Sequence, residues 1–198
     1  MKNISALILA LLISISSFAQ SQKEDIAKNA QTYYDYMTAQ NFDGVLDYMY
    51  PKVFEMAPRA QMKAGMEQMF SSPDMKIEFV SNDVTKVSEE KIVDKIIYAA
   101  VFYNSKMKMT FVSEQDKPEE DRKGFFDMMK STMDSQFGAE NVASNFETMS
   151  LIVTMNATMY AIKDPQYTGW KFLGNDDAMK MLVDSIVPES VRTELIKE

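Results

Sequence analysis

The spacing of apolar residues predicts helices in the first part of the folded chain. Over residues 25–39 the apolar positions recur at helical spacing, which predicts an amphipathic helix with one buried stripe. Two shorter helices are predicted between residues 43 and 72, because Pro51 and Pro58 interrupt the pattern there. Asp43 is the expected N-terminal cap of the first of these two helices.

The apolar spacing then changes to a period of two residues, which is typical of β-strands. Residues 75–80, 92–103 and 107–111 carry this alternation or are rich in β-branched and aromatic side chains. The polar residues 88–91 are expected to form the first connection, and Asn104–Ser105 is expected to form a tight hairpin turn. These residues therefore predict a three-stranded antiparallel meander.

The second half of the chain repeats the change from helix to strand. A helix is predicted over residues 117–138, and every odd position from 149 to 161 is apolar, which predicts a strand of about 14 residues. A short strand at 170–173 follows, and then a last helix whose buried face ends at Ile186, before a polar tail. So long a strand usually bends, and we expect one α+β domain with a strongly curved antiparallel sheet, an inserted helix and a C-terminal helix.

The first residues are typical of a secretory signal peptide. Lys2 precedes an unbroken apolar run over residues 6–15, and Ser17 and Ala19 are the small residues that a signal peptidase requires. We expect cleavage near Ala19 and export of residues 20–198, to the periplasm or beyond the cell. The apolar run is too short to span a bilayer comfortably, and no later stretch qualifies, so no integral membrane segment is expected after cleavage.

The composition excludes several kinds of chemistry. The chain has no His and no Cys, which removes thiol nucleophiles, imidazole bases and the usual zinc ligands. A net charge of −8 argues against binding to nucleic acid. The 18 methionines could bind Cu(I) through closely spaced thioethers such as Met62 and Met66, but most of them fall on stripes expected to be buried. We therefore expect neither a metal nor a cofactor.

Several short segments resemble the nuclear transport factor two-like superfamily, which has a cystatin-like cone fold. The resemblance is in the order of the elements and in the segments 33–37, 40–43, 49–54 and 169–173. It implies N-terminal helices packed in a curled antiparallel sheet around an apolar pocket, and a possible homodimer through the outer face of the sheet. The superfamily includes isomerases, dehydratases and non-catalytic binding proteins, so the resemblance leaves the function open.

The isomerase-like members of this superfamily carry a catalytic Asp in an acidic patch after the helices. The corresponding segment here is 54–58, where Met56 stands in place of that Asp and Glu55 is the only nearby carboxylate. We therefore expect an exported, non-catalytic domain that binds a hydrophobic small molecule or a protein partner. One alternative is a cofactor-free isomerase or dehydratase that uses Glu55 and a tyrosine; another is a structural protein of the envelope. The candidate ligand-binding residues are Tyr33, Tyr34, Met37, Phe54, Met66 and Met155.

Overall fold

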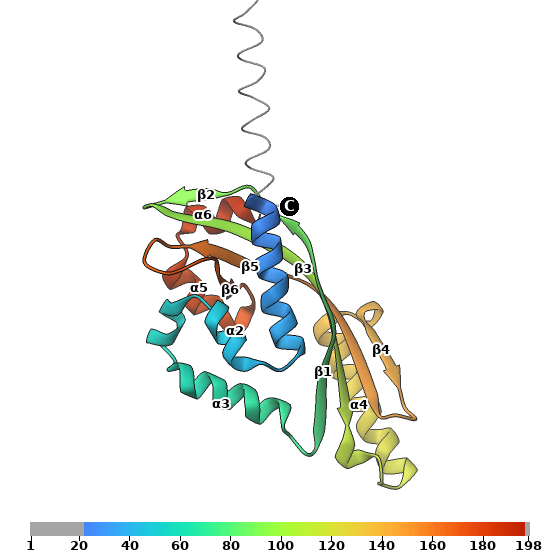
Figure 1. Ribbon diagram of the computed structural model, residues 1–198. Coiled ribbons are helices and arrows are strands. Elements are labelled where there is room, and N and C mark those ends of the chain that lie inside the picture. Colours follow the sequence, from blue (N-terminus) through green and yellow to red (C-terminus); the bar gives the residue numbers. More distant parts are fainter. Residues whose placement is uncertain (1–21, 197–198) are drawn as a thin grey trace, which may run out of the picture.

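The computed structural model describes residues 22–196, so the expected signal peptide and its cleavage site lie outside the described residues. Figure 1 shows an α+β structure in which helices surround a long, twisted sheet. The sheet is antiparallel, has six strands and is not closed. Over residues 22–196 no helix has both the length and the apolar character needed to cross a membrane.

The elements follow one another in an order close to the expected one. An N-terminal helix over residues 22–38 comes first. The helices after it are α2 (Phe42–Tyr48), η1 (Pro51–Glu55), α3 (Arg59–Phe70), η2 (Val112–Glu114), α4 (Glu119–Phe137), η3 (Ala139–Asn141), η4 (Asp177–Met179), α5 (Lys180–Ile186) and α6 (Glu189–Leu195). The strands are β1 (Met75–Val87), β2 (Lys91–Val93), β3 (Ile96–Phe111), β4 (Val142–Asn145), β5 (Ser150–Lys163) and β6 (Lys171–Gly174).

Two long strands form the centre of the sheet. β3 has 16 residues and β5 has 14, and they pair without a break from Ile97 opposite Lys163 to Thr110 opposite Ser150. β1 and β2 share the outer edge of β3, and β4 and β6 share the outer edge of β5. Because β3 and β5 run the whole length of the sheet, they connect two halves that have different surroundings.

Helices cover both faces of one end of the sheet, which we call the two-sided half (β2, β6, residues 96–103 of β3 and 157–163 of β5). The N-terminal helix packs its apolar stripe on the face formed by odd-numbered residues such as Val101 and Ala161. η1, α2, α5 and α6 pack on the opposite face, which includes Tyr98 and Ile162. Apolar side chains on both faces of these strands are therefore buried.

Only one face is covered at the other end, which we call the one-sided half (residues 75–81 of β1, 104–111 of β3, β4 and 150–156 of β5). α4 packs there on odd-numbered residues such as Met109 and Leu151, with Phe126 buried against them. The even-numbered face carries Lys106 and other polar side chains that are at least partly exposed. This half keeps the alternation of apolar and polar residues that a half-solvated strand requires.

The predicted hairpin turn at Asn104–Ser105 was wrong. β3 passes straight through these residues, and Asn104 pairs with Asn156 of β5. The tight turn instead lies at Asp94–Lys95, between β2 and β3, where φ is +50° and +70°. Two successive positive φ angles are typical of the hairpin turns that usually contain Asn-Gly. Because this turn contains no glycine, it lacks the usual sequence signal of a hairpin turn.

Three smaller expectations also need correction. Asn41, not Asp43, caps α2: its side-chain oxygen accepts a hydrogen bond from Gly44 N at 3.1 Å. The strand β4 was missed, and the expected polar tail contains the helix α6, which buries Val191 and Leu195.

The predicted helix over 117–138, which ends at Gly138 with φ +87°, and the 14-residue strand are confirmed.

Candidate ligand pocket

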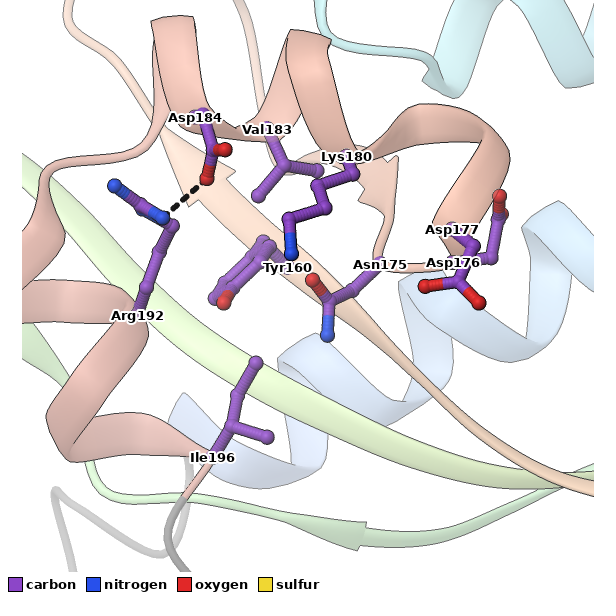
Figure 2. A pocket seen from close by; sticks show the side chains of 9 residues that line it. All are labelled: Tyr160, Asn175, Asp176, Asp177, Lys180, Val183, Asp184, Arg192 and Ile196. Atoms are coloured by element: carbon purple, nitrogen blue, oxygen red, sulfur yellow. Dashed lines mark hydrogen bonds and ion pairs between the residues drawn. The ribbon is translucent and has the colours of Figure 1, made fainter.

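The C-terminal segment folds back on the even-numbered face of the two-sided half and borders an open pocket of about 280 Å³ there. After β6, Asp176 Oδ1 accepts a hydrogen bond from Met179 N at 3.0 Å, which starts η4 and α5. Pro188 separates α5 from α6 and sets the first turn of α6. The pocket is lined by Tyr160, Asn175, Asp176, Asp177, Lys180, Val183, Asp184, Arg192 and Ile196 (Figure 2).

Tyr160, near the C-terminal end of β5, lines this pocket. The residue is only 1% exposed, and its hydroxyl makes no hydrogen bond with any residue from 22 to 196. Burial raises the pKa of Tyr160 to about 12, so the hydroxyl stays protonated at neutral pH. The hydroxyl is not among the buried polar atoms that lack a partner in the described residues, which are Arg122 Nε and Asp134 Oδ1, so it is accessible from the pocket and can donate to a ligand there.

Two further polar groups at the pocket have no partner among the described residues. Lys180 points from α5 toward Tyr160 and Asn175, as Figure 2 shows, and its ammonium group forms no ion pair with a described residue. The side chain of Asn175 is also without a hydrogen bond to the described part of the chain. The ammonium, the amide and the Tyr160 hydroxyl therefore present free donors to the same space.

Arg192 forms the far wall and is held in a fixed orientation. Its Nε donates to Val187 O at 3.0 Å, and its Nη1 forms an ion pair with Asp184. Both contacts join α6 to the end of α5, so they also hold the two helices together. The remaining Nη2 group has no contact with a described residue and is a further donor on this wall.

The opposite side of the pocket is acidic. Asp176 and Asp177 lie across the view from Arg192 in Figure 2, on the segment that follows β6. Burial is the main reason that the pKa values of Tyr33 and Tyr103 are raised, and the negative charge of Asp176 raises both further. The negative charge of Asp176 therefore acts on two half-buried tyrosines, one of which, Tyr33, was a candidate from the sequence.

The structure divides the six candidate ligand-binding residues between separate parts of the core. Tyr33 and Tyr34 pack between the N-terminal helix and the sheet, where the Tyr34 hydroxyl donates to Met159 Sδ at 3.3 Å. Phe54 and Met66 are half-buried against the cluster that includes α5 and α6. Met155 packs in the cluster under α4, in the other half of the sheet.

The two remaining candidates from the sequence lie away from any common site. Met37 is half-buried near the end of the N-terminal helix. Glu55, the candidate catalytic carboxylate, is exposed at the end of η1 and lines neither of the two pockets described here. Asp164 is instead the buried carboxylate that bonds to a tyrosine: it is 1% exposed, and its Oδ2 accepts a hydrogen bond from the Tyr50 hydroxyl at 2.7 Å.

A second pocket, of about 320 Å³, lies in the one-sided half, at the edge of β5 between β4 and β6. It is lined by Gln136, Phe137, Asn141, Thr154, Met155 and Asn156. The Asn141 amide is already used, because it donates to Phe137 O at 2.8 Å. No charged side chain lines this pocket, and it lacks a buried donor like Tyr160 among the described residues. The pocket at α5 and α6 is therefore the stronger candidate.

The described residues do not gather into a conventional metal site. Within residues 22–196 no group of three or more acidic side chains is placed to hold a metal ion. Met62 and Met66, the methionines considered for copper, are half-buried against apolar core residues. Met181 points the other way and is 81% exposed. This arrangement fits core packing for Met62 and Met66.

The pocket was not predicted from the sequence, because its residues come from segments that carry no recognisable binding motif. Tyr160 was one of the few apolar exceptions among the even positions of the long strand, and Arg192 lay in the expected polar tail. The run Asn175–Asp177 between a strand and a helix was the available signal for a polar site.

Comparisons of the chain with protein-family models, with curated proteins and with solved structures find no match.

Proposed function

We propose that this chain is an exported, non-catalytic binding domain that holds a small molecule in the pocket between β5, α5 and α6. The observation that carries the proposal is the Tyr160 hydroxyl, which has no hydrogen bond to a described residue and lines a space of about 280 Å³. Small-molecule sites combine apolar surface with a few convergent polar groups, and here Val183 and Ile196 supply the smaller, apolar part of the wall.

Binding explains the pocket better than acid–base catalysis does. A general base needs a pKa near the working pH, whereas Tyr160 has its pKa raised to about 12 and acts as a hydrogen-bond donor. Asp176 is exposed, and one of its oxygens is already engaged as the cap of η4. The chain also has no His or Cys that could transfer a proton or attack a substrate.

The proposal also includes export of the chain and a distant relationship to the cone-fold superfamily. Residues 1–19 support delivery to the periplasm or the outside of the cell, and the order of helices and antiparallel strands supports a distant relationship to the cone-fold superfamily. The sequence led us to expect a hydrophobic ligand or a protein partner. Because charged and polar side chains form most of the pocket wall, we propose a small polar ligand for this site.

Native mass spectrometry of protein purified from its own host tests the proposal. We expect a bound small molecule on the wild-type chain, and loss of that mass in Tyr160→Phe and Lys180→Met, which remove one donor each and keep most of the apolar volume. Lys106→Met is the matched control, since Lys106 is exposed on β3 in the other half of the sheet.

The control must keep the bound mass. Repeated absence of any bound molecule from the wild-type chain would contradict the proposal. A bound mass that both pocket variants retain would contradict it too, because the molecule would then be held somewhere else.

A further inference from the structure

The charges around the pocket are separated into two groups, and this separation says what kind of ligand fits. Lys180 and Arg192 supply the positive charges, and Figure 2 shows Asp176 and Asp177 at the other end of the view. Asp184 is already used in the ion pair with Arg192. The free donors and the free acceptors therefore face the pocket from different sides.

Four free donor groups line the pocket. The Lys180 ammonium points toward the Tyr160 hydroxyl and the Asn175 amide, and the Arg192 Nη2 lies on the far wall (Figure 2); none of them bonds to another described residue. Free donors that include two cationic groups are the usual surroundings of a bound carboxylate or phosphate. A ligand oxyanion would give each of them an acceptor.

The acidic residues of the pocket favour a carboxylate over a phosphate. Asp176 Oδ1 accepts a hydrogen bond from Met179 N, while Oδ2 has no hydrogen bond to a described residue. With three aspartates against one lysine and one arginine, the wall carries a net negative charge at neutral pH. A dianionic phosphate would be repelled by this wall, whereas a single carboxylate with a cationic amine near Asp176 would complement it.

The pocket has the dimensions of a small-molecule site. Its volume of about 280 Å³ is near the lower end of the roughly 300–1,000 Å³ of such sites, and it is open to solvent on one side. Val183 and Ile196 leave an apolar surface for a short side chain between the two charged ends. Resting on the proposed function, we infer that the ligand is a small zwitterionic carboxylate of the size of a free amino acid with an apolar side chain.

Isothermal titration calorimetry with four probes tests this inference. The probes are L-leucine, 4-methylpentanoate, which lacks the amine, 3-methylbutylamine, which lacks the carboxylate, and inorganic phosphate. We expect L-leucine to bind at least about tenfold more tightly than either truncated molecule, because each truncation leaves one end of the pocket unpaired. Phosphate is expected not to bind.

Three variants test which pocket residues bind the carboxylate and the amine of the ligand. Lys180→Met is expected to weaken L-leucine and 4-methylpentanoate by about tenfold or more, whereas Asp176→Asn is expected to weaken L-leucine alone. Asparagine can still cap η4, so the second variant should fold normally. Lys106→Met is the control and should leave all four affinities unchanged.

The outcomes separate this inference from the proposed function. Phosphate binding that depends on Lys180, or equal affinity for L-leucine and 4-methylpentanoate, would overturn the zwitterion while leaving a binding pocket in place. If no probe binds but the native chain carries a mass that Lys180→Met removes, the ligand class is wrong and the proposed function stands. If no probe binds and no such mass is found, both are wrong.

Discussion

The two halves of the sheet are built from the same two strands and differ in what covers them. In the two-sided half, residues 98–101 of β3 are all buried, because helices lie on both faces. In the one-sided half, Met107 and Met109 face α4 while Lys106 and Lys108 lie on the open face. The polarity of each strand segment therefore follows the number of helical layers around it.

The comparison also explains why the candidate pocket lies where it does. In the one-sided half, the single layer of α4 packs on the sheet through Phe126 and half-buried methionines. In the two-sided half, two short helices joined at Pro188 cover a wide face, and the charged side chains of Lys180 and Arg192 border it. The end of α4 also borders a pocket, of about 320 Å³, but no charged side chain among the described residues lines it, so the two halves differ in the charge of their pocket walls.

The largest expected effect comes from two isoleucines of β5 on the same face of the sheet. Ile162 is fully buried in the two-sided half, and Ile152 is only half-buried in the one-sided half. We expect Ile162→Ala to lower the free energy of unfolding by about 2–5 kcal/mol and Ile152→Ala by about 1 kcal/mol or less. Urea denaturation of both variants measures the difference, and equal losses would mean that the two faces are covered alike.

A smaller effect is expected from the buried polar pair of the two-sided half. The Tyr50 hydroxyl donates to Asp164 Oδ2 at 2.7 Å, and Asp164 is 1% exposed. Tyr50→Phe should cost about 1.5–3 kcal/mol, since it leaves a buried carboxylate oxygen unpaired. Ser150→Ala, which removes the partner of the Thr148 hydroxyl in the one-sided half, should cost about 0.5–1.5 kcal/mol. Thermal unfolding of the two variants would contradict this ranking if Ser150→Ala cost more.

Alkaline pH is expected to lower the stability of the protein through tyrosines buried in the two-sided half. Burial is the first cause of the raised pKa values of Tyr34, Tyr50, Tyr98 and Tyr160, all of which lie there, above the ordinary value of 10.0. The unfolded chain therefore loses its tyrosine protons at lower pH than the native chain does. Stability should be constant with respect to these groups below pH 10 and then fall by roughly 1.4 kcal/mol per pH unit for each tyrosine.

Urea denaturation between pH 8 and pH 11.5 measures this fall. Tyr34→Phe removes one of the buried hydroxyls and should make the fall less steep, whereas Tyr36→Phe, at a half-buried tyrosine, serves as the control. A fall of the same steepness in Tyr34→Phe and in the wild type would contradict the explanation.

The smallest expected effect concerns the turn between β2 and β3, and a buried residue of the one-sided half gives the contrasting sign. Lys95 has φ +70° in the turn between β2 and β3, and Lys95→Gly should stabilise the chain by about 0.5–1 kcal/mol, because glycine adopts this conformation without strain. Met149 has φ +48° at the start of β5 but is fully buried, so Met149→Gly should destabilise the chain despite the same relief of strain. Chemical denaturation distinguishes the two signs, and a gain in Met149→Gly would be contrary to expectation.

The sequence was sufficient to predict elements whose residues determine their own conformation. Pro118 and Gly138 bound α4, and the alternation of β5 was long enough to identify the strand and its length. The turn at Asp94–Lys95 was not predictable, because tertiary pairing of β2 with β3 holds two residues other than glycine at positive φ. β3 was divided wrongly because Asn104–Ser105, although typical of turns, pair with β5 on the adjacent strand.

The candidate site was less predictable than the fold. Tyr33 was chosen for its aromatic hydroxyl, and the structure places it near Asp176 rather than in an apolar cavity with Phe54 and Met155. The polar pocket depends on α6, which brings Arg192 back to Tyr160 from a segment expected to be a tail. Chain reversals of this kind depend on contacts between residues far apart in sequence, and a local pattern does not record them.

An amide NMR titration of the chain with L-leucine compares the two halves in one experiment. The account predicts saturable chemical-shift changes at Tyr160, Asn175, Lys180 and Arg192, which line the pocket, and none at residues 104–111 in the one-sided half. The absence of any shift at millimolar L-leucine, or shifts concentrated on residues 104–111, would contradict it.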